Sequence, residues 1–160
     1  MTEGMSKGVH IANFEKFVGI CRTHEPGVVT LGMWGELYIP VATVRKYNLG
    51  KPDSGRVHIH VYFDGDCQVI GIDWGVAEDV SSYTVTYSAS NTGNPVRPAR
   101  IRLKGFFRHH GIQTFQRYDD ECGKYVGPWE KPYFHLGKDS YSGLYTIDLT
   151  TGFGLQGGGR

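Results

Sequence analysis

The sequence has no long apolar run, and it has few of the Ala, Leu, Glu and Lys stretches typical of helical proteins. A transmembrane helix needs roughly 20 consecutive apolar residues, so we expect no membrane protein and no all-helical fold. The three cysteines form no close pair, which is a poor basis for a disulfide framework. Residues 1–8 also lack the features of a secretory signal. These observations predict a cytoplasmic protein.

Acidic residues are missing from one long stretch. No Asp or Glu occurs between Asp79 and Asp119, whereas the stretch carries Arg97, Arg100, Arg102, Lys104, Arg108 and Arg117. A local excess of positive charge predicts an anionic partner, either nucleic acid or an acidic protein surface. The alternative is a set of ordinary solvated side chains, because the net charge of the whole chain is only +1.

The residues that are abundant favour strands and tight turns. Aromatic residues make up 13% of the chain, and it contains 23 glycines among 160 residues. This length suits one compact domain, which we place at 1–152 and follow with a flexible Gly-rich tail at 153–160. The predicted fold is mainly β (α+β), a small barrel or sandwich of antiparallel strands with two short helices.

Local patterns predict two helices and one hairpin in particular. We expect short helices over Val41–Tyr47 and Gly105–His110. Apolar and polar residues alternate over Arg56–Phe63, and Asp64-Gly65 is a typical hairpin turn before the returning strand Gln68–Trp74.

The two halves of the chain resemble each other. The matching segments are 44–49 with 107–112 and 60–73 with 135–148. The same order of strand, short helix and hairpin therefore occurs twice, which predicts two pseudo-repeats at about 9–79 and 80–150, the second with about a dozen extra residues around 119–127. The alternative is that short apolar patterns recur by chance. The strands before the two helices show the same order of inward and outward residues only if one residue is skipped.

One segment of the first half combines a Gly turn, an Ile-Pro strand end, an Arg-bearing helix and a hairpin. The residues concerned are Gly35, Ile39, Pro40, Arg45 and Leu49, with the hairpin at 57–72. In this, residues 35–74 resemble the AbrB/SpoVT family of swapped-hairpin DNA-binding domains. Two family arginines are missing, since Glu36 stands at the turn and Val44 in the helix. The resemblance implies a DNA-binding transcription regulator and, if both halves are such units, a pseudo-twofold barrel made by one chain.

Basic residues near the two predicted helices are the candidates for contacts with nucleic acid. We expect a strand over 100–104 to present Arg100, Arg102 and Lys104 on one side, because side chains alternate across a strand. Lysine and arginine neutralise phosphates. The full candidate set is Arg45, Lys46, Arg97, Arg100, Arg102, Lys104, Arg108 and His109.

Histidines in the predicted hairpin supply a metal-binding hypothesis. His58 and His60 share one face of a strand, Asp64 follows, and His135 in the other half offers a third imidazole. The spacing from His58 to Asp64 resembles the first motif of the cupin family, although cupins carry Glu in place of Asp64. The alternative is that the histidines occupy the wetter face of a half-buried strand and that the protein binds no cofactor.

No pattern of catalytic residues emerges from the sequence, so we expect a binding protein rather than an enzyme. The leading hypothesis is a nucleic-acid-binding regulator that uses a basic strand face. The first alternative is a protein-binding accessory or inhibitor module, for example a viral or mobile-element antagonist of a host protein. The second is a cupin-like metalloprotein with a divalent metal.

Overall fold

The computed structural model describes residues 25–32, 35–89, 95–112, 117–121, 123–126 and 133–153. Apart from one 3-10 turn, η2 (Leu149–Thr151), the elements in these ranges are strands and two α-helices. They are β1 (Val28–Leu31), β2 (Glu36–Ile39), α2 (Val41–Tyr47), β3 (His58–Asp64), β4 (Val69–Val76), β5 (Tyr83–Thr84), β6 (Thr86–Tyr87), β7 (Ala99–Arg102), α3 (Lys104–His109), β8 (Arg117–Asp119), β9 (Lys124–Val126), β10 (Tyr133–Lys138) and β11 (Tyr145–Asp148).

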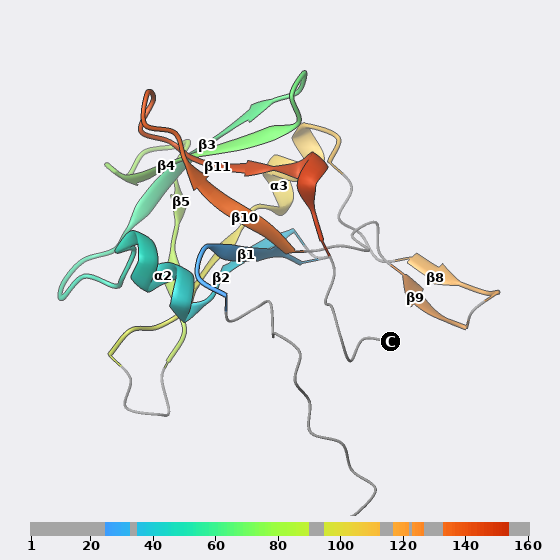
Figure 1. Cartoon of the computed structure of the whole chain (residues 1–160), viewed down its shortest axis with the longest axis horizontal. Coiled ribbons are helices and arrows are strands. Elements are labelled where there is room, and N and C mark those ends of the chain that lie inside the picture. The colour runs from blue at the N-terminus through green and yellow to red at the C-terminus, as the bar shows by residue number, and fades with distance from the viewer. Residues whose placement is uncertain are drawn as a thin grey trace, which may run out of the picture.

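Nine of the described strands form one antiparallel sheet in the order β5-β3-β4-β11-β10-β1-β2-β7-β6. The sheet curves into a nearly closed barrel, and α2 and α3 pack at different places against it (Figure 1). The predicted mainly β fold with two short helices is therefore confirmed. The hairpin of β8 and β9 lies apart from the barrel and overlaps the stretch around 119–127 where the second pseudo-repeat was predicted to carry extra residues.

The sheet interleaves hairpins from the two halves of the chain. The first half supplies the pairs β1–β2 and β3–β4, and the second supplies β6–β7 and β10–β11. No hairpin pairs with the other hairpin of its own half, because β1 joins β10, β2 joins β7, β4 joins β11 and β3 joins β5. The described pairings of these hairpins with other strands therefore join one half of the chain to the other.

Alternation along the strands directs apolar side chains into the barrel. In β7, Ala99 and Ile101 are fully buried while Arg100 and Arg102 are exposed, and in β2 the side chains of Leu37 and Ile39 are buried opposite them. The buried core residues are Val29, Leu31, Leu37, Ile39, Val44, Leu49, Ile59, Ile70, Ile72, Val85, Ala99, Ile101, Leu103, Phe106, Phe107, Phe134, Leu136, Tyr145 and Ile147. Both halves thus contribute to a single core.

The two helices end in the same way. Asn48 after α2 adopts a left-handed conformation with φ of 55°, and Gly111 after α3 does the same with φ of 70°. The next residue in each case, Leu49 or Ile112, donates its N–H to a carbonyl inside the helix, at 2.9 Å and 2.8 Å. The bounds of α2 match the prediction, and α3 begins one residue earlier than predicted, at Lys104.

The chain end extends the sheet further than predicted. Phe153, placed at the start of the flexible tail, instead exchanges two backbone hydrogen bonds with Tyr133, at 3.1 Å and 2.9 Å. The rest of that predicted tail, 154–160, lies outside the described residues, as do residues 9–24 of the first pseudo-repeat. No helix within the described ranges has the length and apolar character to cross a membrane.

Candidate nucleic-acid interface

The outer face of β7 carries two of the predicted cations. Arg100 and Arg102 are exposed, because the alternating Ala99 and Ile101 turn into the barrel. The sequence prediction that Lys104 continues this strand is wrong. The strand ends at Arg102, Leu103 turns into the core with no exposed surface, and Lys104 is the first residue of α3.

The exposed side of α3 carries the next two cations. Lys104 and Arg108 are four residues apart, so their side chains lie on the same side of the helix. Both are exposed, whereas Phe106 and Phe107 on the other side are buried. Only Leu103 separates α3 from β7, so the exposed cations of the helix follow directly in the sequence on those of the strand. We call Arg100, Arg102, Lys104 and Arg108 the basic surface.

One carboxylate lies within this surface. Glu36 on β2 stands opposite Arg102 in the strand register, and its Oε1 accepts a hydrogen bond of 3.0 Å from Nη1 of the diagonal neighbour Arg100. The Arg100 guanidinium also lies 5.0 Å from the ring centre of Tyr38. The ion pair holds Arg100 in place and neutralises part of its charge.

The other predicted cations are Arg45, Lys46, Arg97 and His109, and the two on α2 lie away from the basic surface. Because β2 and β7 run antiparallel, α2 begins beside Ala99 and α3 begins beside Glu36, at opposite ends of a strand pair about 10 Å long. Arg45 and Lys46, in the last turn of α2, are exposed but belong to the other end. Arg97 is half-buried before β7, and His109 is exposed beside Arg108.

The aromatic residues of α3 are not available for stacking on bases. Phe106 and Phe107 have exposed fractions of 6% and 1%. The ring of His110 lies 4.7 Å from Phe106 and 5.1 Å from Phe63, between ring centres. Desolvation by these neighbours, followed by the nearby His109, lowers the pKa of His110, so His110 adds little positive charge near neutral pH.

The predicted metal ligands do not converge. His58 is buried at the start of β3, with Nδ1 3.2 Å from the Thr84 hydroxyl, while Nε2 of His60 lies 2.9 Å from Asp79. His135 is on β10, which β4 and β11 separate from β3. The described residues contain no group of three or more His, Cys, Asp or Glu side chains arranged to hold a metal ion.

Asp64 has a structural role instead. Its carboxylate accepts hydrogen bonds from the backbone N–H groups of Cys67 and Asp66, at 3.1 Å and 3.0 Å, in the turn between β3 and β4. These bonds, the one from Cys67 first, lower the pKa of Asp64. The interaction also raises the pKa of the Cys67 thiol, first through their hydrogen bond and then through the negative charge of Asp64. The proposed cupin-like site is therefore not formed by these four residues.

Sequence analysis missed a hollow beside the barrel. A pocket of about 320 Å³ lies between the segment that follows α2 and the strands β5 and β6, and Lys51 and Arg56 line it. Neither cation stands in a run of basic residues, and the threonines beside them come from a segment about 30 residues away. No local pattern in the sequence signals such a combination.

We compared the chain with protein families, curated proteins and solved structures. No family model matches the chain, and no curated protein or solved structure matches it either.

Proposed function

We propose that this protein binds nucleic acid through the basic surface formed by β7 and α3. The observation that carries the proposal is the continuity of Arg100, Arg102, Lys104 and Arg108 across a strand and the helix that follows it. Strand and helix hold these side chains on a rigid support, as phosphate contacts require. Buried apolar neighbours, among them Ile101 and Phe107, fix the direction in which the cations point.

The interleaved hairpins give a second support. The sequence resemblance to the AbrB/SpoVT family, if it holds for both halves, implies a pseudo-twofold barrel of swapped hairpins in one chain. The strand order alternates hairpins from the two halves, which agrees with that implication. The same resemblance implies a role in the regulation of transcription, and we include that role in the proposal.

The chemistry of the surface favours duplex over single-stranded nucleic acid. Phe106 and Phe107 are in the core, so the described part of α3 offers no aromatic ring for stacking on unpaired bases. Arginine and lysine contact phosphates irrespective of base identity. We therefore expect binding that depends on the backbone and on salt.

Fluorescence anisotropy with labelled duplex and single-stranded DNA tests the proposal. Four phosphate contacts predict a slope of log affinity against log salt of about −3 to −4, or a loss of about a hundredfold between about 50 and 200 mM salt. The duplex is expected to bind more tightly than the single strand. No binding to either DNA at low salt would overturn the proposal and leave an acidic protein surface as the partner of these cations.

Substitutions of opposite effect sharpen this test. Arg102→Gln removes one cation and is expected to lower affinity and to flatten the salt slope by about 1. Glu36→Gln removes the carboxylate that neutralises Arg100 and is expected to increase affinity. Lys138→Gln on β10, which β1 and β2 separate from β7, is the matched control and is expected to change neither quantity. A loss of affinity in Lys138→Gln equal to that in Arg102→Gln would contradict a defined surface.

A further inference from the structure

The pocket beside the barrel combines cations, hydroxyls and apolar surface. It has a volume of about 320 Å³, at the lower end of the range for small-molecule sites. Its walls come from the segment after α2 and from the strands β5 and β6. The lining residues are Lys51, Pro52, Gly55, Arg56, Val57, Thr84, Val85, Thr86 and Tyr87. No acidic residue is among them.

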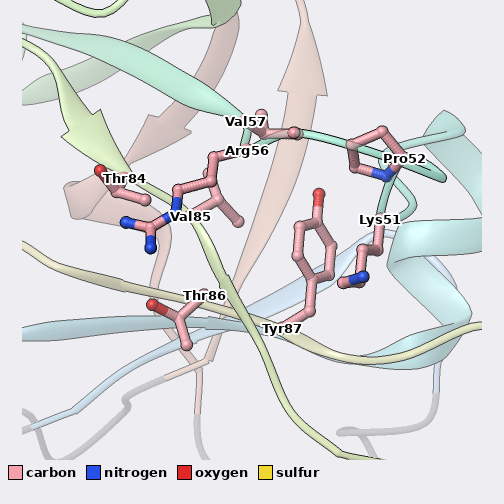
Figure 2. A pocket seen from close by; sticks show the side chains of 9 residues that line it. Lys51, Pro52, Arg56, Val57, Thr84, Val85, Thr86 and Tyr87 are labelled. Atoms are coloured by element: carbon pink, nitrogen blue, oxygen red, sulfur yellow. The ribbon is translucent and has the colours of Figure 1, made fainter.

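The charged and polar groups are divided between two ends of the pocket. Figure 2 shows the Arg56 guanidinium on the side of Thr84 and Thr86, and the Lys51 ammonium on the other side of the Tyr87 ring. The Thr84 hydroxyl is engaged with Nδ1 of His58, at 3.2 Å, so the donors at this end are the Arg56 guanidinium and the Thr86 hydroxyl. An anion with several oxygens fits such a set of donors.

The hydroxyl of Tyr87 holds its ring in place as a wall. This hydroxyl donates a hydrogen bond of 2.7 Å to the carbonyl oxygen of Leu49, at the end of the α2 segment. Burial raises the pKa of Tyr87 to about 12, so the phenol stays neutral and places no negative charge beside the cations. The ring of Tyr87, together with Pro52 and Val57, gives the pocket an apolar surface.

We propose that this pocket binds a nucleoside monophosphate, with the phosphate at Arg56 and the Thr86 hydroxyl and the base against the Tyr87 ring. The size of the pocket admits one such molecule, and the absence of acidic lining residues suits its charge. A planar base gains from contact with an aromatic ring and an apolar wall. This site does not depend on the basic surface, because none of its lining residues belongs to β7 or α3.

Isothermal titration of the intact chain with AMP, inorganic phosphate and adenosine tests the proposal. We expect AMP to bind more tightly than either part alone, because both ends of the pocket contribute. Absence of AMP binding at millimolar concentration would overturn the proposal, and so would equal affinity for AMP and inorganic phosphate. A 5′-phosphorylated trinucleotide carries the same phosphate on a strand end, so affinity equal to that of AMP would assign the site to strand ends, and weaker affinity to free mononucleotides.

Three substitutions locate the binding. Arg56→Gln is expected to weaken AMP at least about tenfold, since a charge-assisted hydrogen bond is lost from an exposed residue whose replacement leaves the core intact. Thr86→Val, which removes a hydroxyl at nearly constant shape, is expected to weaken it less. Lys138→Gln, outside the pocket, is expected to bind AMP as the parent does. Unchanged affinity in Arg56→Gln would show that AMP binds elsewhere, whatever the outcome of the DNA experiment.

Discussion

A single buried threonine joins α2 to the start of β1. The Thr43 hydroxyl donates a hydrogen bond of 2.6 Å to the Val28 carbonyl and accepts one of 3.0 Å from the N–H of Gly27. Thr43→Val keeps the shape but leaves both backbone groups unpaired, so we expect the free energy of unfolding to fall by about 2–4 kcal/mol. Thr43→Ser keeps the hydroxyl and is expected to cost about 1 kcal/mol. Urea denaturation measures both, and equal losses would contradict the hydrogen-bonding role.

Exposed aspartates make stability depend on acidity. Hydrogen bonds from Ser142 lower the pKa of Asp139, and hydrogen bonds from Thr150 lower that of Asp148. At a pH between the lowered folded values and the usual 3.8, the unfolded chain binds more protons than the folded one. These carboxylates therefore stabilise the fold above about pH 4, and this stabilisation is lost as the pH falls through the folded values.

Denaturation in urea at a series of pH values tests this linkage. The midpoint is expected to fall between about pH 5 and pH 2.5, and Asp148→Asn is expected to reduce that fall while lowering stability at neutral pH. Thr150→Val removes the hydroxyl donor to Asp148 and should act in the same direction, though the backbone bond of Thr150 remains. An unchanged pH profile in Asp148→Asn would show that this carboxylate does not contribute.

At the scale of single residues, the sequence predicts which side of a strand a side chain occupies better than it predicts which residue that side chain contacts. The expectation that Arg100 and Arg102 point outward holds because alternation is a local property of a strand. The four predicted metal ligands do not form one group, because β4 and β11 separate His135 on β10 from His60 on β3. No local pattern reports the distance between strands that far apart in the sequence. The partner of His60 is Asp79 from the segment after β4, a contact that depends on how the chain turns there.

At the scale of elements, the sequence identifies those with strong local signals. Helix α2 matches its predicted bounds because Pro40 precedes it in an extended conformation and Asn48 ends it in a left-handed one. The turn at Asp64-Gly65 likewise lies where expected, between β3 and β4. At the start of α3, Leu103 stands where the first half has a proline, and the strand predicted over 100–104 extends two residues beyond Arg102, the last residue of β7.

Two glycines of the α3 segment give a test with opposite signs. Gly105 lies inside the helix with open space around its Cα, so Gly105→Ala is expected to stabilise the protein by about 0.5–1 kcal/mol. Gly111 has equally open space but a φ of 70°, so Gly111→Ala is expected to cost about 1 kcal/mol. Thermal or urea unfolding of both variants checks this. The same sign for both would show that backbone conformation does not decide the effect.

At the scale of the whole molecule, the strand order could not be derived from the sequence. The repeated segments predict two similar halves, but they do not say whether each half closes on itself or shares its strands with the other. Both arrangements would bury the apolar side of β2, because Leu37 and Ile39 need only an apolar neighbour on the next strand. The structure places Ile101 and Ala99 of the second half beside them, and the barrel depends on such pairings between halves.

The interleaving predicts that neither half is stable alone. Fragment 1–79 retains the hairpins β1–β2 and β3–β4, but every described pairing that joins these hairpins into one sheet is with the second half. We expect separate fragments 1–79 and 80–160 to lack the circular dichroism spectrum of the intact chain, because isolated hairpins are at best marginally stable.

Mixing the two fragments is expected to restore that spectrum and to give a 1:1 complex in size-exclusion chromatography with light scattering. As a control, Ile101→Asp in the second fragment places an unpaired charge in the core opposite Leu37 and should prevent assembly. A folded, monomeric fragment 1–79 would contradict the interleaved arrangement, since it would have to pair β2 and β4 within its own half. Restoration only with the unsubstituted fragment would show that the contacts between halves, rather than those within each, hold the barrel together.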